Sequence, residues 1–417
     1  MNVIVYGTGY VGLSLCRVLS SSHYITGIDV DVNKVELLNK QYSSNHLTFE
    51  TCVSENTFKN ANVIYITVGT PSNDDGSTDL HYLFEVADDI VECMNKWNVN
   101  NDLLIILKST IPCGTTLKFE SYITDRVCSN KLHFAFNPEF LREGNEVYDL
   151  MNPDRIVIGC TDSDKDYILN VYSHLWSNYF NNVKVITTNY NTAEMIKYAS
   201  NSFLALKISY INELSELCSK IGADIIKVAE GVGSDNRIGN KFLNSGLGWG
   251  GSCFPKDCHS LLYEGNKVGC SMSILNSCIS VNEMCLNRAV EILENKFGDL
   301  KDKEFAIFGI TFKPGTDDIR DSVSLNLCHK LLEKNCKLKV HDPIALNNLN
   351  SEEGIVKCSD IQECVKGVDA IIIATEWDCY RDLNYELLGE SMRNKIIFDG
   401  RHLLYGSVPS GFEYLHL

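Results

Sequence analysis

The stretch "NVIVYGTGYVGLSL", residues 2–15, decides the fold. It opens with an apolar run typical of a buried strand, and Gly7, Gly9 and Gly12 follow in the spacing GxGxxG at the mouth of an amphipathic helix. Glycines in this pattern permit a tight turn, close approach of a pyrophosphate and close packing of helix against strand. The stretch therefore predicts the first strand and helix of a dinucleotide-binding domain.

Asp29 supports this interpretation. It lies at the end of the next predicted strand, twenty residues after Gly9, where a carboxylate accepts hydrogen bonds from an adenosine ribose. A carboxylate there repels a 2′-phosphate, so NAD is favoured over NADP, although Lys34 is near enough to soften the preference. The alternative is an ordinary strand-turn-helix with packing glycines. The spacing, the context and Asp29 together favour the cofactor.

The alternation of strands and helices continues beyond this stretch to about residue 190 and restarts near Asp302. Between them, residues 192–221 keep helical spacing without Gly or Pro and predict one long helix that ends near Gly222. We expect an α/β protein with two Rossmann-like, doubly wound parallel-sheet domains joined by a central helical domain. The expected bounds are 1–190, 191–298 and 299–417.

Composition narrows the function classes. The net charge of −17 argues against a nucleic-acid partner, and no apolar run is long enough to span a membrane. The start of the chain does not look like a signal sequence, so we expect a cytoplasmic protein. Most of the 17 cysteines lie in apolar periodic segments and are expected to be buried thiols rather than disulfides. No Cys/His spacing indicates a metal site.

One cysteine has unusual neighbours. In "GLGWGGSCFPKD", residues 246–257, four glycines and a tryptophan precede Cys253, and Lys256 and Asp257 follow it. A thiolate is a strong nucleophile toward a carbonyl carbon and forms more readily near a positive charge. A buried structural cysteine in a glycine-rich loop is the competing interpretation. The density of Gly, Lys and Asp around this thiol favours the nucleophile.

Two pairs of polar residues are spaced i, i+4. "NPEFLREG" contains Glu139 and Glu143, and the predicted long helix contains Lys197 and Asn201. If both segments are helical, each pair faces one site. Such pairs usually lie on a solvated helix face, but apolar residues flank Lys197 and Asn201.

Two further loops follow predicted strands of the first sheet. "TVGTPSNDDG" contains Thr70 and Pro71, and "KSTIPCGTT" contains Ser109 and Thr110. Loops at the carboxyl ends of parallel strands line the ligand crevice of such a sheet. Turn chemistry alone also explains their Gly and Pro residues. We expect the Thr110 hydroxyl to face the nicotinamide end of the cofactor.

Taken in order, these motifs resemble the UDP-glucose/GDP-mannose dehydrogenase family of nucleotide-sugar dehydrogenases. The resemblance runs from Met1 to about Arg401. Its other motifs are "NPDRIVIG", "AEMIKYASNSFLALKISYINE", "RIGNKFLNSG", "FGITFKPGTDDIRDS" and "FDGR". It implies an NAD-dependent four-electron oxidation of the sugar C6 alcohol to a carboxylate. In that reaction Cys253 captures the intermediate aldehyde and carries it through a thioester.

The resemblance also implies residue roles. The implied catalytic residues are Cys253, Lys197, Asn201, Asp257, Glu139 and Thr110. The implied NAD-binding residues are Gly7, Gly9, Tyr10, Val11, Gly12, Asp29, Lys34, Thr70, Pro71, Ser109, Thr110, Glu143, Lys256 and Arg320. The implied UDP-sugar-binding residues are Glu139, Phe140, Leu141, Glu143, Lys197, Asn201, Arg237, Asn244, Gly248, Trp249, Gly250, Phe312, Lys313 and Arg401. The matching arginine in the family, at Arg237, reaches a neighbouring subunit's site, which implies a homodimer or larger homo-oligomer.

Several alternatives stay open. "RIGNKFLNSG" looks more like the UDP-glucose branch, and GDP-mannose or another nucleotide sugar is the alternative substrate. A two-electron dehydrogenase of the 6-phosphogluconate type would need no nucleophilic cysteine, and a non-catalytic binding protein would need none of the acid and base candidates. The chain also departs from the family at residues 41–46, where a longer segment is usual.

Overall fold

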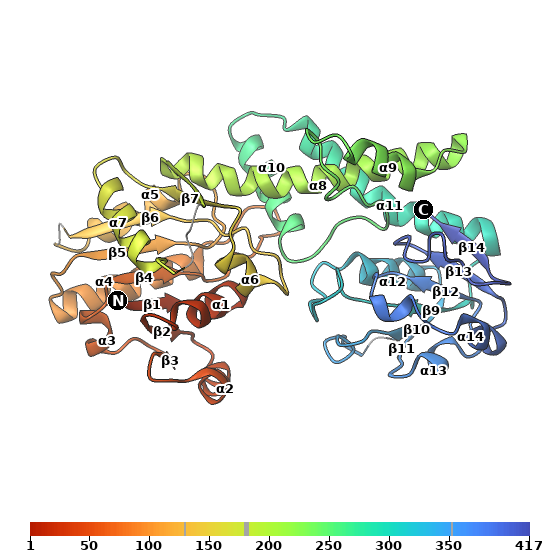
Figure 1. Ribbon diagram of the computed structural model, residues 1–417, viewed down its shortest axis with the longest axis horizontal. Helices are drawn as coiled ribbons and strands as arrows, with labels where there is room; N and C mark the ends of the chain where they lie inside the picture. The colour runs from red at the N-terminus through yellow and green to blue at the C-terminus, as the bar shows by residue number, and fades with distance from the viewer. Residues whose placement is uncertain (129–130, 179–182, 352) are drawn as a thin grey trace. The chain divides into compact units, whose positions relative to one another are not determined.

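The computed structural model describes residues 1–128, 131–178, 183–351 and 353–417 (Figure 1). The chain forms two compact units, Met1–Ser200 and Asn201–Leu417. The long helix α8 (Tyr190–Ile221) begins in the first unit and continues into the second. It confirms the long helix predicted over 192–221, and Gly222 follows it in a left-handed conformation with φ +74°.

Unit 1 is built on an eight-stranded sheet in the order β3-β2-β1-β4-β5-β6-β7-β8. Its strands are β1 (Asn2–Tyr6), β2 (Tyr24–Ile28), β3 (Leu47–Glu50), β4 (Val63–Ile66), β5 (Leu103–Leu107), β6 (Leu132–Phe136), β7 (Arg155–Gly159) and β8 (Lys184–Thr188). The sheet is parallel except where β6 meets β7 antiparallel, at Phe136 and Gly159. The predicted doubly wound parallel sheet is confirmed, with this one antiparallel pair as an exception that the sequence did not indicate, because the chain between β6 and β7 turns back instead of crossing over.

Helices cover both faces of this sheet. They are α1 (Tyr10–Leu19), α2 (Val32–Tyr42), α3 (Glu55–Lys59), α4 (His81–Trp97), α5 (Thr115–Thr124), α6 (Glu146–Met151) and α7 (Lys165–Leu175). Alternate residues of each strand enter opposite cores, so Ile64 and Ile105 belong to one apolar cluster and Tyr65 and Ile106 to the other. With both faces buried, the central strands read as continuous apolar runs.

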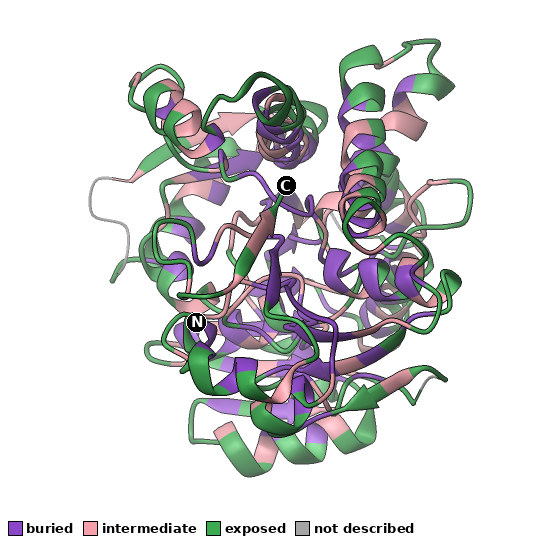
Figure 2. Cartoon of the chain, turned by 90° about the vertical axis from the view of Figure 1, so that its right-hand side faces the viewer, coloured by how far each residue is buried: buried purple, intermediate pink, exposed green. Residues whose placement is uncertain are grey.

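Unit 2 begins with the rest of α8 and the helices α9 (Ile225–Gly233), α10 (Phe254–Lys267) and α11 (Ser273–Phe297). A six-stranded parallel sheet follows in the order β11-β10-β9-β12-β13-β14. Its strands are β9 (Glu304–Phe308), β10 (Lys337–His341), β11 (Ile355–Lys357), β12 (Ala370–Ile373), β13 (Ile396–Asp399) and β14 (Glu413–His416). Its helices are α12 (Val323–Glu333), α13 (Ile361–Val365) and α14 (Tyr385–Ser391). Figure 2 shows buried segments in the interior of this unit and exposed turns on its helices.

The structure bears on two expectations from composition, that most cysteines are buried and that the chain contains no membrane-spanning segment. Eleven of the 17 free cysteines are buried, which confirms that most of them pack as small apolar side chains. In the described part of the chain, none of the helices combines the length and apolarity that crossing a bilayer requires.

Candidate active site

The glycine turn after β1 has the geometry that the motif predicts. Gly7 has φ +84°, and a Cβ there would lie 2.9 Å from the Val68 backbone. A Cβ at Gly12 would lie 1.9 Å from the Gly7 carbonyl oxygen, so Gly12 lets helix α1 pack against the strand. At Gly9, which caps the N-terminus of α1, a Cβ would meet nothing within 4 Å. Open space at a helix N-terminus fits the pyrophosphate of a dinucleotide.

Asp29 closes the same turn at the end of β2. Its Oδ2 accepts hydrogen bonds from the Thr8 amide (3.0 Å), the Thr8 hydroxyl (2.7 Å) and Lys34 Nζ (2.7 Å). Partial burial opposes the charge, but the hydrogen bonds from Lys34 and Thr8 outweigh it and lower the Asp29 pKa. Asp29 is thus a fixed carboxylate next to the glycine turn, and these residues fit the ribose of NAD.

The loops after β4 and β5 are bonded together at the carboxyl end of the sheet. Thr70 Oγ1 donates to the Thr110 carbonyl oxygen at 2.8 Å, and Ser109 Oγ donates to the Val68 carbonyl oxygen at 2.7 Å. The hydroxyl groups of Thr70 and Ser109 therefore hold the loop backbones in place. Thr110 is only half-buried.

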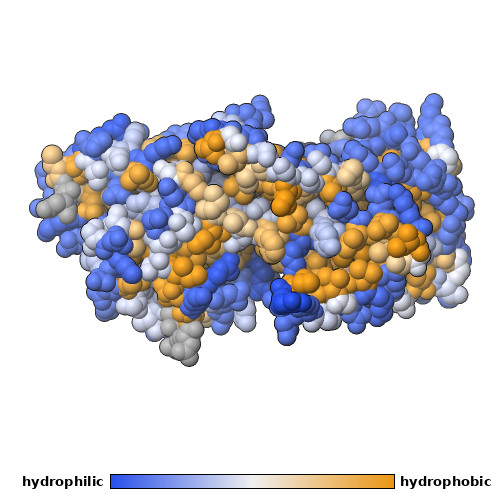
Figure 3. All heavy atoms as spheres, turned by 90° about the horizontal axis from the view of Figure 1, so that it is seen from above, coloured by the Kyte–Doolittle hydropathy of each residue, from blue (hydrophilic) through white to orange (hydrophobic). Residues whose placement is uncertain are grey.

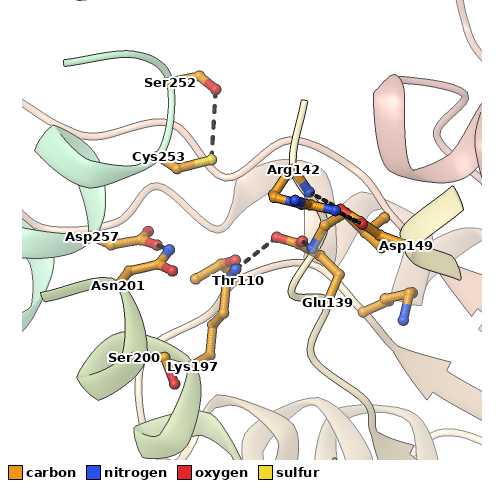
Figure 4. A network of polar contacts seen from close by, with 12 residues as sticks. Thr110, Glu139, Arg142, Asp149, Lys197, Ser200, Asn201, Ser252, Cys253 and Asp257 are labelled. Atoms are coloured by element: carbon orange, nitrogen blue, oxygen red, sulfur yellow. Dashed lines mark hydrogen bonds and ion pairs between the residues drawn. The ribbon is translucent and has the colours of Figure 1, made fainter. Parts of the chain in front are cut away.

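Lys197 and Glu139 form a buried ion pair (Figure 4). Lys197 Nζ lies 2.8 Å from Glu139 Oε1, and the two side chains are 4% and 11% exposed. Glu139 Oε2 accepts from the Leu141 amide at 2.7 Å. Burial alone would raise the Glu139 pKa, but the Lys197 ammonium and these hydrogen bonds lower it, so the carboxylate is held ionised. The pair offers a base and a cation inside a protected site.

Glu139 and Glu143 do not lie on a helix, so the condition under which this pair was expected to face one site is not met. The chain after β6 is irregular through this segment and turns at Glu143. Pro138 disfavours a helix, and the bond from the Leu141 amide back to the Glu139 carboxylate stabilises a turn instead. Arg142 then fastens the end of the segment, because its Nη2 and Nε contact the Asp149 carboxylate at 2.5 Å and 3.0 Å (Figure 4).

Lys108 is a buried cation that our sequence analysis missed. Its Nζ donates to Asn137 Oδ1 at 2.9 Å, and Tyr172 donates to the same oxygen at 2.5 Å. Burial lowers the Lys108 pKa to about 8, with Glu139 opposing the shift and Lys197 adding to it. Lys108 lies in the quoted motif "KSTIPCGTT", but the pattern gave no sign that its side chain turns inward.

In unit 2, Cys253 caps the N-terminus of helix α10. Its side chain is exposed, whereas most cysteines of the chain are buried, so the interpretation as a buried structural cysteine is wrong. The Ser252 hydroxyl lies 3.6 Å from its Sγ (Figure 4). The positive end of the helix dipole at this position stabilises a thiolate.

Asp257 joins the first turn of α10 to helix α8. It is 1% exposed; its Oδ2 accepts from Asn201 Nδ2 at 2.6 Å and its Oδ1 from Lys256 Nζ at 2.7 Å. Its amide donates to the Cys253 carbonyl oxygen at 2.9 Å. The Lys256 ammonium, which we expected beside the thiolate, is thus bonded to Asp257. Figure 4 shows Asp257 and Asn201 pointing toward each other.

The glycines ahead of Cys253 allow their loop to approach the C-terminal sheet. A Cβ at Gly250 would lie 2.2 Å from the Asp321 carbonyl oxygen, and one at Gly251 would lie 2.6 Å from the Phe312 ring. The Leu247 amide donates to the Gly400 carbonyl oxygen at 3.1 Å. No larger residue fits at Gly250 or Gly251 without moving the backbone or the ring.

Arg401 is the cation most closely tied to this loop. Its Nη1 donates to the Gly248 carbonyl oxygen at 3.2 Å and its Nε to the Ala374 carbonyl oxygen at 2.9 Å. Its Nη2 is buried and has no hydrogen-bond partner. A buried guanidinium nitrogen without an acceptor fits an anionic ligand such as a diphosphate. Lys313 follows Phe312 in the sequence, and its Nζ lies 5.7 Å from the centre of the Phe312 ring.

The other candidates differ in exposure and partners, and Phe140 lies against the ion pair, with its ring centre 5.6 Å from Lys197 Nζ. Arg320 makes a two-pronged contact with Asp318, with its Nη2 2.6 Å from the carboxylate. Arg237 is 89% exposed and bonded to Asp235. Asn244 is exposed as well. Tyr10, Val11, Pro71, Phe140 and Glu143 remain only partly buried or exposed. Each unit thus holds part of the candidate set, and α8 carries Lys197 in the first unit and Asn201 in the second.

Three family models match the chain in sequence order. They are the NAD-binding domain of the UDP-glucose/GDP-mannose dehydrogenase family over residues 36–177, its central domain over 191–284 and its UDP-binding domain over 306–405. NAD is therefore the cofactor of the first unit, in agreement with the geometry at Gly9 and Asp29.

Known proteins match over nearly the whole chain. A UDP-glucose 6-dehydrogenase of Rickettsia conorii is 39% identical over 440 aligned positions, which cover 99% of this chain and 98% of the relative. One of Bacillus subtilis is 37% identical and covers 99% and 97%. A solved UDP-glucose dehydrogenase of Pyrobaculum islandicum superposes with a TM-score of 0.88 at 34% identity, covering 96% of this chain and 94% of that one.

Proposed function

The chain belongs to the UDP-glucose/GDP-mannose dehydrogenase family, and on that premise we propose that it oxidises UDP-glucose to UDP-glucuronate through a covalent adduct on Cys253. The observation that carries the proposal is the exposed Cys253 thiol at the N-terminus of α10, beside the buried Asn201–Asp257–Lys256 network. NAD, when bound at the glycine turn, accepts a hydride from the substrate carbon, and two NAD molecules are reduced per sugar.

The role of Cys253 follows from the balance of the reaction. Removal of a hydride and a proton from the C6 alcohol gives an aldehyde. The Cys253 thiolate then forms a C–S bond to that carbon, and the former carbonyl oxygen takes a proton. Loss of a second hydride and a proton gives a thioester, which water cleaves to the carboxylate and the free thiol. The adduct keeps a reactive aldehyde bound between the two oxidations.

The buried charges of unit 1 support the proton transfers. We assign Glu139 as the base that activates water for thioester cleavage, since its carboxylate is held ionised by Lys197. Lys197 stabilises negative charge on the substrate oxygen. In unit 2 Asn201 and Asp257 form the polar support next to Cys253, and Thr110 is a further candidate for positioning the water.

The diphosphate of the substrate has its best-supported partner in Arg401. Its guanidinium touches the loop that leads to Cys253 and has one buried N–H group without an acceptor. The Phe312 ring lies close to Gly251 of the same loop, and Lys313 follows it in the sequence. A diphosphate would complete the hydrogen bonds of Arg401, which supports a nucleoside-diphosphate sugar as the ligand class.

The test compares nucleotide sugars. With NAD and UDP-glucose the protein should form NADH at a rate at least tenfold above that with GDP-mannose or a UDP-N-acetylhexosamine. Cys253→Ser should lose steady-state turnover, while Cys270→Ser, at an exposed cysteine beyond the same helix, should keep it. A preference for GDP-mannose would show that GDP-mannose, and not UDP-glucose, is the substrate. Full turnover of Cys253→Ser would favour a two-electron dehydrogenase.

We also propose that the protein forms homodimers through α8. Phe203, Tyr210, Leu217 and Ile221 are exposed on this helix at spacings of seven, seven and four residues, which place them on one face. The face of the molecule seen in Figure 3 carries α8 to α11, and apolar side chains gather there between polar ones. The exposed Arg237 is available to a neighbouring subunit. The free thiols favour a reducing compartment, the cytoplasm.

A further inference from the structure

One side chain of α11 holds the loop that leads to Cys253. Asn282 Oδ1 accepts from the Trp249 amide at 2.7 Å, and Asn282 Nδ2 donates to the Trp249 carbonyl oxygen at 2.9 Å. The carboxamide thus satisfies both backbone polar groups of one loop residue, as a neighbouring strand would. A loop residue with both groups fixed in this way loses most of its backbone freedom.

The glycine before Trp249 fits the same contact. Gly248 has φ +106°, and a Cβ there would lie 2.5 Å from Asn282 Oδ1. The loop can therefore accept this asparagine only with glycine at position 248. One of the four glycines ahead of Cys253 is thus explained by Asn282, and not by the C-terminal sheet.

The indole of Trp249 is fixed as well. It is 5% exposed, and its Nε1 donates to Ser209 Oγ of α8 at 2.9 Å. Ser209 in turn donates to the Cys278 carbonyl oxygen of α11 at 2.7 Å. The backbone and the side chain of Trp249 are therefore bonded to two long helices that pack together in unit 2.

Trp249 touches the residue that follows the nucleophile. The rings of Trp249 and Phe254 meet edge to face, with centres 6.4 Å apart and planes at 78°. Phe254 is the first residue of α10, and Cys253 is the cap directly before it. A shift of the indole would therefore move the start of α10 and, with it, the direction of the Cys253 side chain.

We propose that Asn282 is a positioning residue for Cys253, acting through Trp249 and Phe254. This inference rests on the proposed function, because it concerns the step in which the Cys253 sulfur bonds to the aldehyde carbon. Asn282 itself contacts neither reacting group. Its contribution is to hold the thiol in one direction, and misplacement of a reacting group by about 1 Å lowers a rate on the order of 100-fold.

The experiment measures Cys253 directly. Iodoacetamide alkylation of the Cys253 peptide is followed by mass spectrometry across pH 6–9 in the full-length protein, together with kcat and KM for both substrates. Asn282→Ala should change the rate of alkylation and its pH profile, lower kcat about 10- to 100-fold and leave KM for NAD unchanged. Asn282→Asp keeps only the bond to the Trp249 amide. Its alkylation rate and its kcat should lie between those of the wild type and those of Asn282→Ala.

A matched control and a second variant complete the test. Asn287→Ala, at an exposed asparagine of the same helix, should behave like wild type. Ser209→Ala removes the indole bond and the bond from Ser209 to the Cys278 carbonyl oxygen, and leaves both Asn282 bonds in place. It should reproduce part of the Asn282→Ala effect, and it keeps the test decisive if Asn282→Ala folds poorly. Wild-type alkylation and kcat in both Asn282→Ala and Ser209→Ala would overturn the inference. Absence of UDP-glucose oxidation by the wild type would instead reject the proposed function, while the alkylation comparison still judges the positioning role.

Discussion

At the scale of single residues, Asp29 offers a direct test of cofactor binding. Asp29→Ala removes the carboxylate that Thr8 and Lys34 hold in place, so KM for NAD should rise about 10- to 100-fold while kcat changes little. Initial rates at saturating UDP-glucose measure it. Asp125→Asn, at the exposed end of α5, is the control. An unchanged KM for NAD would place the ribose elsewhere.

Residues with local partners were predictable from the sequence, whereas residues with distant partners were not. Asp29 and the three glycines of the first turn lie within one short span, so their spacing carried enough information. Lys108 and Asn282 have partners 29 and 33 residues away, and only the folded chain brings each pair together. Lys256 is bonded to its sequence neighbour Asp257, and its expected contact with NAD stays a prediction.

His402 makes the stability of the folded state depend on pH. Burial lowers its pKa to about 4, with the nearby His416 and Arg288 adding to the shift and Asp399 opposing it. The folded state therefore keeps His402 neutral while the unfolded state takes up a proton below pH 6.5. The contribution of neutral His402 to the free energy of unfolding is fully present above pH 6.5 and is lost as the pH falls toward 4. The loss amounts to about 3 kcal/mol at 1.36 kcal/mol per pKa unit.

Urea unfolding of wild type and His402→Asn at several pH values isolates this effect. As the pH is lowered from 7 to 4, the free energy of unfolding of the wild type should fall relative to that of His402→Asn. A difference that is constant over this range would show that His402 titrates alike in both states.

At the scale of secondary-structure elements, long periodic segments were predicted well and short irregular ones poorly. Helix α8 was found within two residues of its start, because no Gly or Pro interrupts its spacing. "NPEFLREG" has the i, i+4 spacing of a helix, yet Pro138 and the Glu139–Leu141 bond produce a turn. The antiparallel pairing of β6 and β7 depends on the path of that turn, which periodicity does not record.

Glu194 of α8 stabilises the start of α5. Its carboxylate accepts from the Gly114 amide (2.6 Å) and the Thr116 amide (2.8 Å), backbone donors that the start of a helix leaves without an intrahelical partner, and from the Thr116 hydroxyl (2.6 Å). Glu194→Ala should lower the free energy of unfolding by about 2–4 kcal/mol, because three buried donors lose their acceptor. Chemical denaturation measures it. Glu213→Ala, exposed on the same helix, should change it by less than about 1 kcal/mol.

At the scale of the whole molecule, the sequence order of the motifs predicted the family and the kinds of ligand. It predicted a central helical segment between two nucleotide-type sheets, and both sheets are present. The three expected domain bounds remain predictions, since the chain separates into two compact units near residue 200. The candidate catalytic residues belong to both units, and sequence alone assigned them through the resemblance.

The proposed dimer is tested on the exposed face of α8. Leu217→Glu places a charge in the middle of the apolar stripe and should shift the protein from dimer to monomer, because burying an unpaired carboxylate costs several kcal/mol. Sedimentation velocity at micromolar concentration measures the state. Lys220→Glu, exposed on the same helix outside the stripe, should leave the dimer intact. A wild-type protein that sediments as a monomer would reject the dimer.

The central claim is that one thiol carries a sugar carbon through two oxidations. The most direct measurement is the amount of NADH formed per UDP-glucose consumed, with the product identified by mass spectrometry. We predict two NADH per sugar and UDP-glucuronate as the only product. One NADH per sugar, with the aldehyde released into solution, would contradict the claim.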